Sequence, residues 1–429
     1  MRGGTWLPWV MWGLGALCYL SALFHRMSLS VAGLTAQERF GIDATGLAAF
    51  SVVQLALYAA LQVPVGIGAD RFGPRRLLLA GMIAMAAGTI LFALAGGFAA
   101  AMAGRALIGA GDACMFVSTL RIVHNWFAGS RYAFVASLTG MIGGLGQLIA
   151  TAPLSALLEA RGWTGAFLIA AAVTVVVLVT TAIALKEAPS GVESRAKAVE
   201  RPLTGLRQAW RTPGTRHAMW THFTLMGTFV SFTAVLGQPY LVTAHERTPA
   251  GAGSLLAVVV LGFVLVSTVC GRLASRRPPV RAPLVLGAAL VTTGCGAMLV
   301  AVPGPAPSWL LAVVLFFIGA CGGVSMLAFD LARSSNAVHR AGIATGVANM
   351  GGFSFAVVAQ FGTGVLLDTL SGSGMAPPDA HRAAFAVPLV LAAGGLLAVI
   401  RLHRHAGVPL PGDTGRTGEQ SISVPASAR

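Results

Sequence analysis

The chain has 429 residues, of which 56% are hydrophobic and only 10% are charged. A soluble globular protein with so few charged residues cannot cover its surface with polar groups, so the composition excludes the soluble classes. The formal net charge of +15 does not indicate a nucleic-acid partner, because the sequence shows no basic face on a soluble module.

Apolar runs long enough to cross a bilayer, about 20 residues each, recur along the chain. Twelve such runs predict an all-α membrane protein with twelve transmembrane helices. They lie near residues 8–31, 45–68, 77–95, 98–123, 131–158, 163–185, 217–243, 251–273, 283–302, 307–331, 341–367 and 383–401.

The Lys and Arg residues indicate how these helices are oriented. With the N-terminus inside, the cytoplasmic segments hold most of the 29 Lys and Arg residues, and the outer loops hold only Arg39, Arg161, Arg247 and Arg382. This positive-inside bias predicts a multi-pass plasma-membrane (cell inner membrane) protein with both termini in the cytoplasm.

The first apolar run carries His25 and Arg26 near its outer end. An arginine at the centre of a membrane helix costs roughly 2.5–3.5 kcal/mol on insertion scales, so it needs a partner or a function. One alternative is that Arg26 extends to the outer surface, as long basic side chains do.

The segment after the second run reads GIGADRFGPRR (Gly66–Arg76). It matches G-x-x-x-D-R-x-G-x-R-R, the loop signature of the major facilitator superfamily, at every fixed position and between spans two and three. The chain resembles that family over essentially its whole length. The resemblance implies two pseudo-symmetric six-helix lobes and transport by alternating access. It also implies that the signature forms an inner gate, in which Asp70 caps or pairs with a neighbouring helix end. The gate residues are Gly66, Asp70, Arg71, Gly73, Arg75 and Arg76.

Three stretches resemble the anion:cation symporter branch of the family, and the chain is also similar to uncharacterised actinobacterial facilitators. The stretches are FHRMSLSVAG in the first span, FSVVQLALYAALQVPVG in the second and RALIGAGDA in the fourth. The resemblance implies that Arg26 binds a substrate anion and that Arg105 and Asp112 form a charge pair that responds to protonation. It also implies that Tyr58 and Gln62 line the cavity.

The bacterial sugar-acid carriers of that branch have an acid where this chain has His25, so we expect His25 to supply a second proton site. The alternatives are that Arg105 stabilises the fold without binding substrate and that Tyr58 and Gln62 pack between helices without lining the cavity. Two guanidiniums near one acid, Asp112, leave an unpaired positive charge, which favours an anionic substrate.

The hydropathy falls between residues 186 and 216, which predicts a cytoplasmic linker with a surface helix around Leu203–Trp210. The linker is expected to separate an N-terminal lobe (1–185) from a C-terminal lobe (217–402), and the composition of residues 403–429 predicts a disordered cytoplasmic tail. The lobes are weak copies of each other. GRLASRRPPVR at Gly271–Arg281 corresponds to the Gly66–Arg76 signature, and the stretch that begins at Arg340 corresponds to the one that begins at Arg131. Such a duplication is typical of transporters with a site between the lobes.

The C-terminal lobe offers fewer polar candidates. In span seven, Pro239 predicts a kink, and Gln238 and Tyr240 are candidates to bind substrate, ahead of His222. Asp330 and Arg333 are expected to pair with each other or across the inner gate, and Asn349 is expected to line the cavity.

These features predict a secondary transporter that moves a small organic anion, a carboxylate or sugar acid, together with protons. The alternative is a proton-driven drug or metabolite exporter, although GMIGGLGQLIATAP in span five lacks the Gly-Pro signature of such antiporters. No enzyme motif is visible, and the five cysteines show no metal-ligand spacing. We therefore expect no catalytic activity, no cofactor and no metal. The expected partners are substrate, protons and the lipid bilayer, and we expect a monomer.

Overall fold

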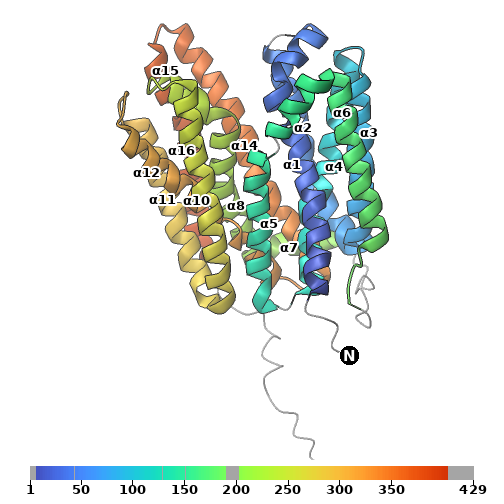
Figure 1. Cartoon of the computed structure of the whole chain (residues 1–429). Helices are drawn as coiled ribbons and strands as arrows, with labels where there is room; N and C mark the ends of the chain where they lie inside the picture. Colours follow the sequence, from blue (N-terminus) through green and yellow to red (C-terminus); the bar gives the residue numbers. More distant parts are fainter. Residues whose placement is uncertain (1–5, 43, 128, 150, 190–201, 404–429) are drawn as a thin grey trace, which may run out of the picture.

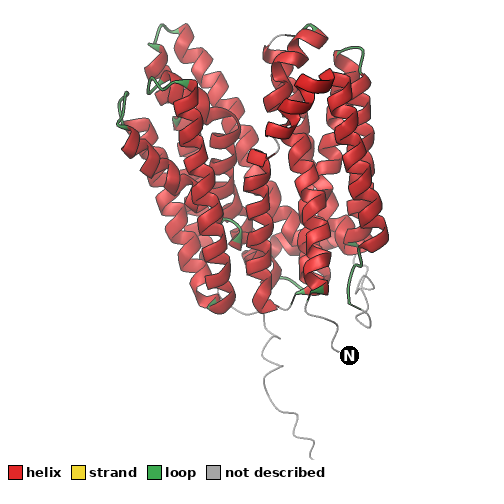
Figure 2. Ribbon diagram, in the orientation of Figure 1, coloured by secondary structure: helices red, strands yellow, loops and turns green. Residues whose placement is uncertain are grey.

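The computed structural model describes residues 6–42, 44–127, 129–149, 151–189 and 202–403. All regular elements in these ranges are helices (Figure 2). The prediction of an all-α protein is therefore confirmed. The predicted tail lies outside the described residues except for its first residue, and so do residues 190–201 of the linker.

The first six helices form one bundle (blue to green in Figure 1). They are α1 (Leu7–Phe40), α2 (Ala44–Phe72), α3 (Pro74–Leu94), α4 (Phe98–Trp126), α5 (Gly129–Ile149) and α6 (Thr151–Ala184). The first helix continues past its predicted end and stops at Gly41, whose φ of 60° a residue with a side chain rarely adopts. Gly162, with a φ of 63°, breaks α6. The predicted fifth span thus consists of α5 and the start of α6.

The second bundle follows the predicted surface helix, which is present as α7 (Pro202–Arg211). Its helices are α8 (Pro213–Ser231), α9 (Gly237–Thr243), α10 (Pro249–Arg276), α11 (Arg281–Ala301), α12 (Ser308–Val324), α13 (Leu327–Ser334), α14 (Ala341–Gly372), α15 (Pro377–Ala384) and α16 (Ala386–His403). Eleven helical stretches of the described chain are long and apolar enough to span a membrane, and α5 completes the predicted twelve.

Span seven departs from α-helical geometry about one turn before Pro239, where the sequence predicts a kink. A π-helical turn, η1 (Phe232–Leu236), joins α8 to α9. Pro239 has no N–H to donate to the carbonyl of Val235, and the N–H of Gly237 bonds back to Phe232 across the wider turn. The irregularity that the structure shows in this span is therefore a π-helical turn at 232–236, just before Pro239.

The two lobes meet along α2 with α14 and along α5 with α10. A Cβ atom on Gly66 would lie 3.0 Å from the carbonyl carbon of Gly342, so only glycine lets α2 and α14 approach this closely. Between described residues, the hydrogen bonds that cross from lobe to lobe begin at Tyr58, midway along α2, and Asn349, in the first third of α14. They continue from there to the end of the lobes where α1 begins. At the opposite end the lobes diverge (Figure 1).

Candidate functional site

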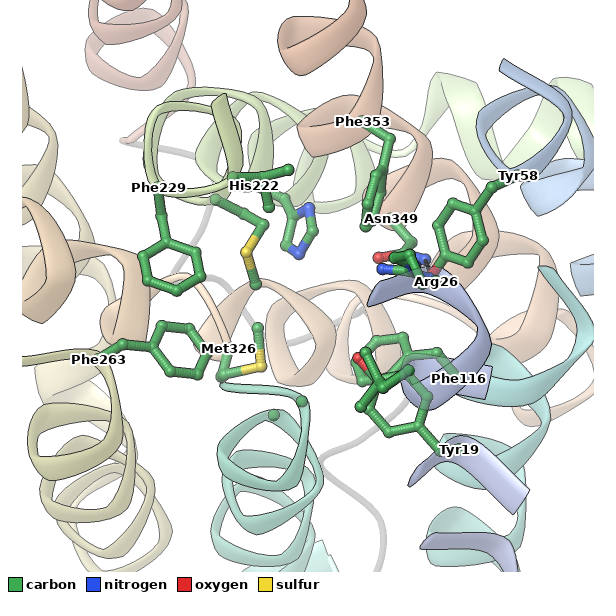
Figure 3. Close-up of a pocket in the computed structure, with 15 residues that line it drawn as sticks. Tyr19, Arg26, Tyr58, Phe116, His222, Phe229, Phe263, Met326, Asn349 and Phe353 are labelled. Atoms are coloured by element: carbon green, nitrogen blue, oxygen red, sulfur yellow. Dashed lines mark hydrogen bonds between the residues drawn. The ribbon is translucent and has the colours of Figure 1, made fainter. Parts of the chain in front are cut away.

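A pocket lies between the two lobes, and side chains from both surround it (Figure 3). It encloses about 420 Å³ of space free of protein atoms, part of which is open to solvent, and both lobes contribute to its wall. The residues that line it are Tyr19, Leu23, Arg26, Tyr58, Phe116, Gly140, Gly143, His222, Met226, Phe229, Val230, Phe263, Met326, Asn349 and Phe353.

Arg26 forms a two-pronged ion pair with Asp112 at the edge of this pocket. Its Nε donates to Oδ2 at 2.9 Å and its Nη2 to Oδ1 at 2.8 Å. The guanidinium also lies 4.4 Å from the ring centre of Tyr58 and 5.4 Å from that of Phe353. The side chain of Arg26 is 15% exposed, whereas that of Asp112 is fully buried. An anion in the pocket could therefore contact Arg26 directly. It would affect Asp112 only by way of Arg26.

The expected pair of Arg105 with Asp112 is not formed. The two residues are seven positions apart on α4, which is about 10.5 Å along the helix axis. The neighbouring helix α1 instead brings Arg26 to Asp112.

Arg105 is 1% exposed and is held by neutral groups. It donates to the Ser28 hydroxyl at 3.0 Å, to the carbonyl of His25 at 3.2 Å and to the side-chain oxygen of Gln54. Within the described chain, no carboxylate oxygen lies within 4.0 Å of its guanidinium nitrogens. Of these two buried arginines, only Arg26 has a carboxylate partner among the described residues, so Arg105 remains a buried positive charge without an adjacent acid.

Tyr58, Gln62 and Asn349 form a polar contact across the lobes. The amide nitrogen of Asn349 donates to the Tyr58 hydroxyl at 3.1 Å and to the Gln62 oxygen at 2.6 Å. Tyr58 and Asn349 line the pocket, and Gln62 lies fully buried one turn beyond it. The structure therefore brings these three predicted residues together.

His25 points away from the pocket. Its ring nitrogens lie 2.8 Å from the Thr174 hydroxyl and 3.3 Å from the Thr89 hydroxyl, inside the N-terminal lobe. The structure therefore does not place His25, a predicted proton site, beside the pocket.

Gln238 and Tyr240 do not line the pocket either. The Tyr240 hydroxyl donates to the carbonyl of Leu299 at 2.6 Å and pairs with His245 at 2.9 Å, so it belongs to the packing of the C-terminal lobe. Gln238 is exposed on α9. A π-helical turn contains an extra residue per turn and so changes the face on which the residues after it lie. His222, which we expected to be a weaker candidate than Gln238 and Tyr240, precedes this turn and lines the pocket.

The expected inner contacts lie at the end of the lobes where they touch. Asp70 accepts hydrogen bonds from the backbone N–H groups of Gly342 at 2.9 Å and Ile343 at 2.8 Å, which caps α14 across the lobe boundary. Arg121 lies 3.5 Å from the same carboxylate and donates to the carbonyl of Val338 at 2.9 Å. Asp70 thus makes the helix-end contact that the family resemblance implies.

The corresponding contact of the other lobe has no acid. At the position that matches Asp70, Ser275 accepts a hydrogen bond from the N–H of Phe134 in α5 at 3.0 Å. Asp330 pairs with Arg333 at 3.0 Å, and Arg333 also lies 4.6 Å from the ring centre of Tyr132 in the opposite lobe. The pair is therefore formed as expected, and Arg333 reaches across the boundary.

The other signature residues shape the loop. Gly73, with a φ of 86°, precedes α3, and Arg75 donates to the carbonyl of Ala182 at 2.5 Å. Arg71 stacks on Phe72, and Arg76 is exposed.

A sequence profile described as Major Facilitator Superfamily matches residues 15–360. The chain belongs to this superfamily. It is therefore a multi-pass membrane transporter of small molecules and not an enzyme.

Individual transporters are similar to parts or most of the chain. A probable sulfoacetate transporter of Cupriavidus necator is 28% identical over 196 residues, which is 45% of each chain. A probable L-galactonate transporter of Escherichia coli is 29% identical over 143 residues, 33% of this chain and 32% of that one. These matches span less than half of either relative. A crystal structure of the E. coli fucose:proton symporter superposes with a TM-score of 0.64 at 16% identity, covering 89% of this chain and 97% of that one, which shows the shared fold.

Proposed function

We propose that this transporter moves a small organic anion, a carboxylate or sugar acid, together with a proton. The observation that carries the proposal is Arg26, which lies at the edge of the pocket with Asp112 as its ion-pair partner. A guanidinium presents two parallel N–H donors that match the two oxygens of a carboxylate. A substrate anion can therefore replace Asp112 on Arg26.

Proton coupling follows from the competition for Arg26. Arg26 is paired with Asp112, and a second buried arginine, Arg105, lies on the same helix as Asp112 without a carboxylate partner among the described residues. When Asp112 takes up a proton, Arg26 loses its partner and an anion gains a site. When the anion leaves, Arg26 favours the charged form of Asp112 again and the proton is released. Proton and anion binding thus favour each other.

The gate contacts support alternating access. In the proposed orientation both termini lie in the cytoplasm of a plasma-membrane protein, so the end where the lobes touch is the cytoplasmic end. Opening towards the cytoplasm then requires Asp70 to leave α14 and Arg333 to leave Tyr132. We propose that the pocket loads from outside in the conformation described above.

The relatives support the anionic class. Sulfoacetate and L-galactonate, the substrates in the names of two of them, are both organic anions. The fucose:proton symporter supports only the fold, because its identity to this chain is 16%.

The alternative, a proton-driven exporter of drugs or metabolites, is favoured by one observation. Most of the pocket wall is apolar, which suits an uncharged or cationic organic compound as well as an anion. The two functions differ in the sign of the proton coupling, because a symporter takes its substrate up with an inward proton gradient and an antiporter expels it.

Uptake into proteoliposomes tests the proposal. A panel of carboxylates, sulfonates, sugar acids and neutral sugars is offered with and without an inward proton gradient. We expect gradient-driven uptake of an anion, a loss of at least about 10-fold in Arg26→Ala because its ion-pair donors disappear, and uptake that no longer follows the gradient in Asp112→Asn.

Arg382→Ala and Asp379→Asn are the matched controls. These residues form an ion pair on α15 and do not line the pocket, so the same substitutions there should leave uptake unchanged. Normal anion transport by Arg26→Ala, or uptake of neutral compounds only, contradicts the proposal and favours the exporter.

A further inference from the structure

The polar groups of the pocket are few and unevenly divided. Of the 15 lining residues, five carry a polar side-chain atom: Tyr19, Arg26, Tyr58, His222 and Asn349. The first three belong to the N-terminal lobe. In the C-terminal lobe, Asn349 already uses its amide nitrogen on Tyr58 and Gln62.

His222 is a buried polar group of this pocket without a hydrogen-bond partner. Its side chain is 0% exposed to solvent, and neither ring nitrogen has a partner among the described residues. A Cβ atom on Gly352 would lie 2.9 Å from Cε1 of the ring, so the glycine leaves room for the imidazole. The ring also packs at 4.8 Å against Phe329. A buried polar group without a partner is costly and calls for a missing ligand.

The ring of His222 points from α8 towards the side of the pocket where Asn349 and Arg26 lie (Figure 3). The rest of the wall on the C-terminal side is apolar. Phe229 and Phe263 stack with their ring centres 4.6 Å apart and their planes at 21°, and Met326 lies beside them.

The small number of polar groups in the pocket wall restricts which substrates can bind. A sugar acid carries several hydroxyl groups, and each one needs a hydrogen-bond partner when the site closes around it. A hydroxyl that is buried without a partner weakens binding by about tenfold. An aromatic or short aliphatic body, in contrast, gains from contact with phenylalanine and methionine side chains.

Building on the proposed function, we propose that the substrate is a monoanion with a compact apolar body and one further hydrogen-bonding group. The anionic group binds Arg26, the body packs on Phe229 and Phe263, and the further group binds His222. Polyhydroxylated sugar acids are then poor substrates.

Binding to the purified full-length protein in nanodiscs tests this inference by calorimetry. The probes are 3-phenylpropanoate, its ortho-, meta- and para-hydroxylated forms, and D-gluconate, each with one carboxylate. We expect 3-phenylpropanoate to bind at least about 100-fold more tightly than gluconate, because gluconate has several hydroxyls to bury. We also expect the best-placed ring hydroxyl to add about tenfold.

His222→Ala should abolish the gain from the ring hydroxyl and leave the affinity for 3-phenylpropanoate within about threefold. His217→Ala is the matched control, because His217 is a buried histidine on the same helix that also lacks partners but does not line the pocket. His222→Gln keeps hydrogen-bonding atoms and should retain part of the gain. It provides a second test of His222 if His222→Ala does not fold.

The outcomes separate this inference from the proposed function. Tighter binding of gluconate that depends on Arg26 overturns the apolar-body substrate but supports anion transport. A hydroxyl gain that survives in His222→Ala, or that is undiminished in His222→Gln, overturns the role of His222. If no anion binds in a way that depends on Arg26, the proposed function fails as well.

Discussion

At the scale of single residues, the pairing of buried charges decides what the site can do. Arg26 and Asp112 lie on different helices and form a bidentate pair, whereas Arg105 is satisfied by neutral oxygens. Breaking a buried ion pair by removing one partner is much more costly than removing an exposed one. The buried ion pair at this site is therefore Arg26 with Asp112.

His245 provides a residue-scale prediction outside the membrane-spanning helices. The backbone N–H of Ala306 donates to its Nδ1 at 3.2 Å, which places the proton of the neutral ring on Nε2, next to the Tyr240 hydroxyl. Burial lowers the pKa of His245, and the nearby Arg247 and Arg382 lower it further. The folded protein thus favours the uncharged ring.

This shift gives stability a defined pH dependence. Below about pH 6.5 the unfolded chain binds a proton at this histidine that the folded chain does not bind. Stability should therefore be constant above that pH and fall below it, by at most about 1.4 kcal/mol per pH unit. Thermal unfolding in detergent at pH 7.5 and 5.5 measures the loss. His245→Gln should be less stable at pH 7.5 and lose less on acidification. Equal losses in both proteins contradict the prediction.

At the scale of helices, the two inner contacts between the lobes are chemically unequal. Asp70 places a carboxylate on the N-terminus of α14, and Ser275 places a hydroxyl at the matching position on α5. A negative charge at a helix N-terminus is stabilised by the helix dipole, typically by 0.3–1 kcal/mol and up to about 2 kcal/mol when partly buried. The contact of α2 with α14 is therefore the stronger of the two.

We expect Asp70→Asn to increase the population that is open at the cytoplasmic end by roughly 5- to 30-fold, which corresponds to a loss of about 1–2 kcal/mol. Ser275→Ala, the matched change in the other lobe, should have a smaller effect because it removes no charge. Distances between spin labels on exposed positions at that end of each lobe report the population. An equal shift in both variants shows that the charge does not control the gate.

At the scale of the whole molecule, the number of acids limits the proton stoichiometry. Asp112 is the acid that the structure places beside the pocket arginine, and His25 lies away from the pocket. One proton moved with one monoanion carries no net charge, so the pH gradient alone drives transport. Two protons would add the membrane potential, about 2.3 kcal/mol per charge at 100 mV.

Uptake of a monoanion into proteoliposomes with a potassium diffusion potential tests this stoichiometry. We expect the same accumulation with and without an inside-negative potential at a fixed pH gradient. An accumulation that rises by about 50-fold at 100 mV indicates a second proton, and its loss in His25→Gln assigns that proton to His25.

The sequence by itself determined the fold class and the twelve spans, because runs of apolar residues reflect the thickness of a bilayer and need no tertiary information. It also placed the Gly66–Arg76 signature, the Asp330–Arg333 pair and the polar residues Tyr58, Gln62 and Asn349, each from a local pattern or a family resemblance.

Tertiary structure alone decided which charges pair and which side chains meet in the pocket. Asp112 pairs with Arg26 because α1 packs on α4, and sequence spacing within α4 carries no information about that contact. His222 lines the pocket, whereas Tyr240, which follows the π-helical turn farther along the same span, does not. Local patterns describe single helices, whereas a binding site between lobes depends on how several helices rotate and pack against one another.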